Sequence, residues 1–123
     1  MTSKKTIFVA FAIEDERQRD FLKGQSLNTK SPFEYVDMSV KEPYATEWKK
    51  RVRTRIRRSD GVIALISRSS LSSSGQEWEI ECAKEESKKL LGIWAYTDDR
   101  TNIKGIKTVV WTWKAIEDFI DSL

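Results

Sequence analysis

One stretch of this chain, residues 59–83, constrains the fold more than any other. Residues 62–66 form an unbroken apolar run, which is typical of a strand buried on both faces of a parallel sheet. Residues 68–75 follow with five serines and are too polar and turn-prone to continue the strand. This segment therefore predicts a buried strand that ends in a serine-rich loop.

The segment after this loop predicts a helix that carries a candidate functional glutamate. Ser74 and Glu77 have the spacing of a capping box, so we expect the helix to begin near Gly75 and to end near residue 88. Glu79 then falls in or just after the first helical turn. A strand, a loop and a helix onset in this order direct Glu79 toward the carboxyl-end edge of the sheet, where open α/β folds bind ligands.

Strands and helices are predicted to alternate along the rest of the chain. Further strands are expected at residues 6–12, 33–38, 90–96 and 107–113. A helix is expected at residues 14–23, with Phe21 and Leu22 as apolar anchors and Gly24 as C-cap. A second helix is expected from a cap at Thr46 to about Arg58, with Trp48, Val52 and Ile56 as an apolar stripe. A last helix is expected at residues 114–123.

This alternation predicts an α/β fold in a single domain, residues 1–123. We expect a flavodoxin-like three-layer sandwich, with about five parallel strands in the order 2-1-3-4-5 and helices on both faces. In that order a ligand crevice opens between the first and third strands. Residues 12–14 and 67–75 are the loops expected to frame this crevice.

Composition excludes several kinds of site. Cys82 is the only cysteine, so an internal disulfide is impossible and a cytoplasmic location is expected. The chain has no histidine, which removes histidine metal sites and histidine-dependent nucleophiles, and we expect no metal. No apolar segment approaches the roughly 20 residues of a membrane span, so no membrane association is expected.

Three segments, in order along the chain, resemble one known family. They are Phe-Val-Ala-Phe-Ala-Ile-Glu-Asp-Glu at residues 8–16, the stretch from Trp48 to Ser67, and Glu79-Ile80-x-x-Ala83. Together they resemble the TIR-like domains of bacterial sensors in Thoeris anti-phage defence. The resemblance covers nearly the whole chain and implies NAD as the substrate, with Glu79 as the catalytic residue.

The position of the catalytic glutamate is open between two residues. The family often has a tryptophan four residues before the glutamate, but that place is Gly75 here and the tryptophan is Trp78. An alignment on Trp78 would put Cys82 at the catalytic position, and a thiol cannot do the same chemistry. Glu79 is preferred because its register also matches the family's following isoleucine and alanine, and Glu81 stays the alternative.

The resemblance implies cleavage of the nicotinamide–ribose bond of NAD. A carboxylate can stabilise the oxocarbenium character that this cleavage develops on the ribose. The residues expected to contact the substrate are Phe11, Ala12, Ile13, Asp37 and Ser67. The product would be an ADP-ribose-derived signal that diffuses to a separate effector, and residues 39–44, from Ser39 to Tyr44, would take part in self-association.

Two other interpretations remain. The chain could be a non-catalytic TIR-like module that signals by self-association or partner binding. Residues 49–58 hold seven cations and could bind nucleic acid, but no aromatic residues interleave with them as a stacking platform requires, so we favour a solvated or self-associating face.

Response regulators are excluded because Ser67 replaces the phosphorylated aspartate, and flavodoxins because residues 12–15 are too acidic to hold phosphate.

Overall fold

Two apolar strands form the centre of the structure, a computed structural model that describes residues 5–26, 33–36 and 48–123. They are β1 (Lys5–Ala10) and β3 (Gly61–Ile66), which pair in parallel with Ile7 opposite Gly61. The remaining elements are η1 (Ile13–Asp15), α1 (Glu16–Ser26), β2 (Phe33–Val36), α2 (Trp48–Arg58), η2 (Arg68–Ser72), α3 (Ser74–Glu85), β4 (Leu90–Trp94), β5 (Thr108–Val109) and α4 (Trp113–Asp121).

The sheet is parallel at every pairing, and its strands lie in the order β2-β1-β3-β4-β5. Every residue of β3 is buried, because a strand between two neighbours with helices on both faces meets no solvent. The predicted α/β class, with a parallel sheet covered by helices, is confirmed. The strand order reverses between β1 and β3, so the carboxyl ends of these two strands border the crevice.

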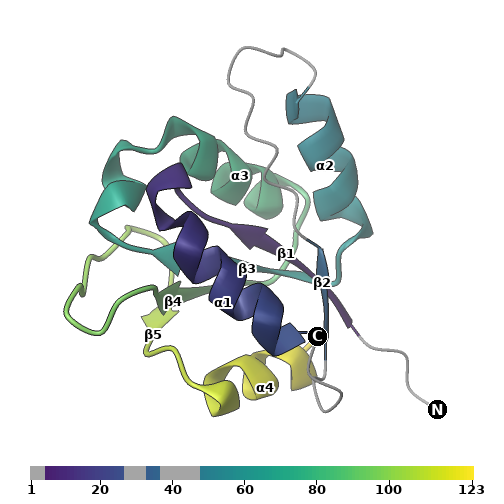
Figure 1. The fold of residues 1–123 in the computed structure, drawn as a ribbon. Helices are drawn as coiled ribbons and strands as arrows, with labels where there is room; N and C mark the ends of the chain where they lie inside the picture. The colour runs from purple at the N-terminus through teal and green to yellow at the C-terminus, as the bar shows by residue number, and fades with distance from the viewer. Residues whose placement is uncertain (1–4, 27–32, 37–47) are drawn as a thin grey trace.

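Helices cover both faces of the sheet, α1 and α4 on one face and α2 and α3 on the other (Figure 1). A separate apolar core lies on each face. Alternate residues of β1 and β3 point to opposite faces, as the pleat requires. One core joins Ile7, Val9, Phe11, Ile63 and Leu65 to the inner faces of α1 and α4. The other joins Phe8, Ala10, Val62, Ala64 and Ile66 to α2 and α3, where the predicted stripe residues Val52 and Ile56 are buried.

The first strand and helix differ from the prediction in three details. β1 ends at Ala10 rather than residue 12, because the Ala12 carbonyl accepts the Asp15 N–H at 2.8 Å in a 3-10 turn. Phe21 is 61% exposed, so its expected anchoring role was wrong and Leu22 alone points inward. Consecutive helical residues point about 100° apart, so both cannot face the sheet. Gly24 is inside α1, which continues to Ser26, so it is not the C-cap.

The last two strands and α3 also have different bounds. Ser73 rather than Ser74 caps α3, its hydroxyl accepting the Gln76 N–H at 3.2 Å. α3 ends at Glu85, where Ser87 takes a left-handed conformation with φ 57°. β4 ends at Trp94, β5 has only two residues, and α4 begins at Trp113 with Thr112 as its cap. Thr46 lies outside the described residues.

Candidate active site

A groove opens at the predicted crevice, beside the carboxyl ends of β1 and β3. Its volume is about 640 Å³, within the range that small-molecule ligands occupy. It is lined by Ile13, Glu14, Trp48, Lys49, Ser72, Ser73, Ser74, Gly75 and Trp78. Both predicted framing loops therefore contribute to the groove, and the first turn of α2 supplies a third side.

Two tryptophans form an aromatic wall in this groove. The rings of Trp48 and Trp78 meet edge to face, with centroids 5.3 Å apart and an interplanar angle of 68°. This geometry is favourable for aromatic pairs. The Lys49 ammonium lies 5.8 Å from the centre of the Trp78 ring. The groove thus combines a flat apolar surface with positive charge.

Gln76 ties the start of α3 to the two central strands. Its side chain is fully buried, and its Nε2 donates to the carbonyls of Ala10 at 3.1 Å and Leu65 at 2.8 Å. These carbonyls belong to the carboxyl ends of β1 and β3. One amide therefore fixes the first turn of α3 over the point where the strand order reverses.

Glu79 lies one turn after Gln76, on the same side of α3, and its side chain has no exposed surface. The preceding residue, Trp78, lines the groove. A ligand in the groove can therefore reach the Glu79 carboxylate only if neighbouring side chains move. Glu81 points elsewhere: its side chain is 62% exposed, and its carboxylate pairs with Lys84 at 3.5 Å.

A buried carboxylate connects the loops that follow three strands. Asp15, 1% exposed, accepts hydrogen bonds from the hydroxyls of Ser67 at 2.5 Å and Tyr96 at 2.9 Å. Burial, followed by the hydrogen bond and charge of Asp15, raises the pKa of Tyr96 to about 12. The Asp15 carboxylate therefore holds the loop that carries Ile13 in place beside the loops after β3 and β4.

A second carboxylate joins the loops after β3 and β4. Asp99 accepts the Arg68 N–H at 2.8 Å and the Thr101 hydroxyl at 2.6 Å. The Thr101 hydroxyl and the Arg68 amide together hold the pKa of Asp99 below its usual value. This edge of the sheet is thus built from cross-linked loops rather than from independent ones.

The other predicted substrate contacts occupy different environments. Ile13 is 52% exposed and lines the groove, as a ligand contact requires. Phe11 is 1% exposed, belongs to the core under α1 and stacks 5.0 Å from the Arg19 guanidinium, which favours a packing role. Ala12 and Ser67 are buried, and Ser67 is engaged with Asp15. Asp37 and residues 39–44 lie outside the described residues.

Sequence reasoning missed three residues of this region: Asp15, Gln76 and Tyr96. In the sequence, Asp15 was noted as one of residues 12–15, which are too acidic to hold phosphate. The partners of Gln76 lie 66 and 11 residues away in the chain, and Asp15 lies 81 residues from Tyr96. A pairing over such distances leaves no local pattern.

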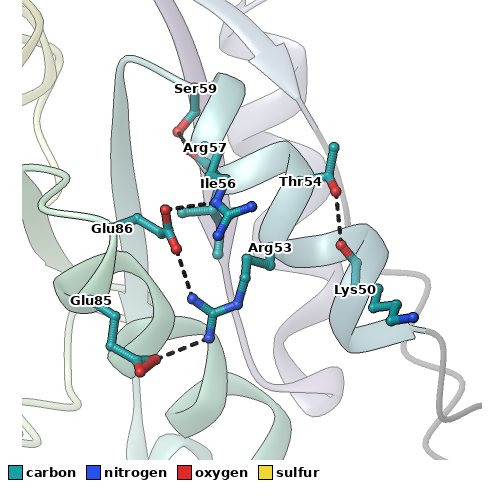
Figure 2. Close-up of polar contacts among 8 residues, drawn as sticks. All are labelled: Lys50, Arg53, Thr54, Ile56, Arg57, Ser59, Glu85 and Glu86. Atoms are coloured by element: carbon teal, nitrogen blue, oxygen red, sulfur yellow. Dashed lines mark hydrogen bonds and ion pairs between the residues drawn. The ribbon is translucent and has the colours of Figure 1, made fainter.

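Part of the basic run on α2 is an interface with α3 rather than a solvated face (Figure 2). Arg53 donates to Glu86 at 2.7 Å and to Glu85 at 3.1 Å, and Arg57 donates to Glu86 at 2.8 Å. The hydrogen bonds from Arg57 and Arg53 lower the pKa of Glu86. Arg53, whose side chain is 29% exposed, is therefore turned toward α3, whereas Arg57, 61% exposed, keeps the solvated position that was expected.

Cys82 packs in the core between the sheet and α3, and its thiol is fully buried. Burial raises the pKa of Cys82, which keeps the unreactive thiol form at neutral pH. The alternative alignment that would place Cys82 at the catalytic position thus has no support in its environment.

These features define a class of protein: a doubly wound α/β domain with an aromatic groove and a buried glutamate where the strand order reverses. The sequence model of the family described as Thoeris protein ThsB, TIR-like domain, matches residues 8–100 of the 123. The chain belongs to this Thoeris TIR-like family, which associates it with defence. No curated protein sequence matches the chain. Within the described ranges, no helix has both the length and the apolar character needed to cross a bilayer.

Proposed function

We propose that this chain cleaves the bond between nicotinamide and ribose in NAD and produces an ADP-ribose-derived signal. The observation that carries the proposal is Glu79, a fully buried carboxylate on the helix that begins above the ends of β1 and β3. Full burial of a glutamate is uncommon, and a buried titratable side chain next to a groove is a candidate for a functional role. Its neighbour Trp78 lines a groove large enough for a ring-bearing ligand.

The chemistry needs one carboxylate and no metal. When the C1′–N bond breaks, the electron pair leaves with nicotinamide and positive charge develops on the ribose. The Glu79 carboxylate would stabilise that charge, as carboxylates do in glycoside hydrolysis. Water, or a hydroxyl of a second acceptor, then adds to C1′ and loses its proton, which yields ADP-ribose or a cyclic or conjugated product.

The groove supplies complementary binding surfaces for NAD. Trp48, Trp78 and Ile13 offer apolar surface to a ring, and Lys49 offers positive charge to the diphosphate. We further propose that the reaction takes place in the cytoplasm and that the product diffuses to a separate effector. Self-association through residues 39–44 belongs to the same proposal, because Glu79 becomes accessible only if its surroundings rearrange.

The test is nicotinamide release from NAD by concentrated protein, followed by chromatography. Glu79→Gln should lower turnover by about 100-fold or more, since a charge-stabilising group contributes on this scale. Glu81→Gln and the matched surface variant Glu77→Gln should stay near the wild-type rate. Loss of turnover in Glu81→Gln, with Glu79→Gln active, would show that the other register is correct.

One observation favours a second function, a non-catalytic interaction module. Glu79 is not among the residues that line the groove, so a ligand in the groove would not contact its carboxylate in this conformation. In that case the wild type would release no nicotinamide at any concentration, even after clustering, while the protein would still self-associate in sedimentation experiments. That pair of results would replace the catalytic proposal.

A further inference from the structure

We infer that Arg53 is a positioning residue for the groove: it fixes the indole of Trp78 and thereby sets how tightly the groove binds the ring of its ligand. This inference rests on the proposed function, because it takes the groove as the NAD site. It concerns a residue outside the groove lining, one helix turn beyond Lys49 on α2.

Arg53 contacts α3 in two ways at once. Its Nη1 and Nη2 reach Glu86 at 2.7 Å and Glu85 at 3.1 Å, near the end of α3 (Figure 2). Its Cζ also lies 5.6 Å from the centre of the Trp78 ring, near the start of α3. A planar guanidinium can stack on a ring and donate from its edge at the same time, which an ammonium cannot do.

The carboxylates hold the guanidinium in place more firmly than a surface pair would. The side chains of Arg53 and Glu86 are 29% and 17% exposed, so water competes only partly for their hydrogen bonds. Arg57 donates to the other oxygen of Glu86 at 2.8 Å, but its side chain is 61% exposed, so this surface pair adds little to the restraint of Glu86. Glu86 therefore acts as the anchor, and Arg53 transmits its position to Trp78.

Trp78 in turn forms the groove wall together with Trp48, 5.3 Å away. Loss of the Arg53 contact would free the Trp78 ring to turn within the pair. Ligand binding would then have to order this ring. The expected consequence is weaker ligand binding with a smaller effect on the chemical step, since Arg53 does not touch the groove itself.

The experiment compares Arg53→Gln with Arg57→Gln in the full chain. Arg57 shares Glu86 with Arg53, but the cations next to the Trp78 ring among the described residues are Lys49 and Arg53, so Arg57 is the matched control. The first measurement is the indole N–H resonance of Trp78 in a ¹⁵N-resolved NMR spectrum, assigned with Trp78→Phe. The second is KM and kcat for nicotinamide release from NAD.

We expect Arg53→Gln to shift the Trp78 resonance and to raise KM about fivefold, the scale of one partly exposed cation–π contact, with kcat changed less. Arg53→Lys should have a KM between those of the wild type and Arg53→Gln. Arg57→Gln should leave the Trp78 resonance in place and keep KM within about twofold of the wild type. An unmoved Trp78 resonance in Arg53→Gln, or equal effects of the two glutamine variants, would overturn the inference.

Failure of the proposed function would look different. A wild-type protein that neither releases nicotinamide nor shows NAD-induced shifts would refute NAD as the ligand. A shifted Trp78 resonance in Arg53→Gln alone would still support the positioning of this ring by Arg53.

Discussion

Alkaline pH should selectively weaken the hydrogen bond between Tyr96 and Asp15. The pKa of Tyr96 is about 12 in the folded chain and about 10 in an unfolded one, so the folded state disfavours its ionisation. A pKa raised by folding gives stability that is complete below pH 10 and lost as pH rises through 12. A difference of two pKa units contributes at most about 2.7 kcal/mol to the free energy of unfolding. About 1.4 kcal/mol of this contribution is lost by pH 11.

Tyr96→Phe is the perturbation that isolates this effect. At pH 8 the variant should be less stable by about 1–2 kcal/mol, because the Asp15 carboxylate loses one donor. The wild type then loses stability between pH 9 and pH 11 while the variant lacks this titration. The difference between the two proteins should therefore shrink toward zero by pH 11.

Urea unfolding at pH 8, 9.5 and 11, followed by far-UV circular dichroism, measures the difference. Lysine ionisation affects both proteins and cancels in the comparison. Ser67→Ala is the matched control: it removes the other hydrogen bond to Asp15 but keeps Tyr96, so it should be destabilised at every pH and retain the alkaline loss. A gap between wild type and Tyr96→Phe that stays constant through pH 11 would refute the reasoning.

Three further changes test the fold around the site by urea or thermal unfolding. Gln76→Leu should destabilise by about 1–3 kcal/mol, because the carbonyls of Ala10 and Leu65 lose their shared donor; an unchanged midpoint would mean that water replaces the amide. Ser87→Gly should stabilise by about 0.5–1 kcal/mol, since φ at Ser87 is 57° and glycine adopts this conformation without steric strain; a lower melting temperature would contradict this. Gly92→Ala should destabilise by about 1–3 kcal/mol, because the added Cβ would lie 2.6 Å from the Thr108 hydroxyl. Gly24→Ala is the control and should be neutral or stabilising, because its Cβ would have no atom within 4 Å. Equal effects of the two alanines would rule out the clash.

The sequence was informative where burial and local pattern coincide. The apolar runs at β1 and β3 predicted the centre of the sheet, and the spacing of Val52 and Ile56 predicted the buried side of α2. Both loops of the groove followed from this arrangement. Phe21 was misplaced because two adjacent apolar residues in a helix do not reveal which one faces the sheet.

The finer parts of the candidate site depend on contacts between distant residues. Spacing alone could not separate Glu79 from Glu81, although the structure buries one and leaves the other at the surface beside Lys84. The Arg53–Glu86 pair was hidden in a basic run that resembled a solvated face. The partner of Arg53 lies beyond its own helix, at the end of α3, so only the packed structure identifies it.

The position of β3 has a consequence for how this chain folds. β3 pairs with β1 through Ile7 and Gly61, more than fifty residues apart, and with β4 on its other side. Contacts of such long sequence separation slow folding, because a large loop must close before they form. During synthesis β1 can have only β2 as a sheet neighbour until β3 has emerged. Folding of the sheet therefore has to wait for residues 61–66, and substitutions there should change the folding rate more than substitutions in β5.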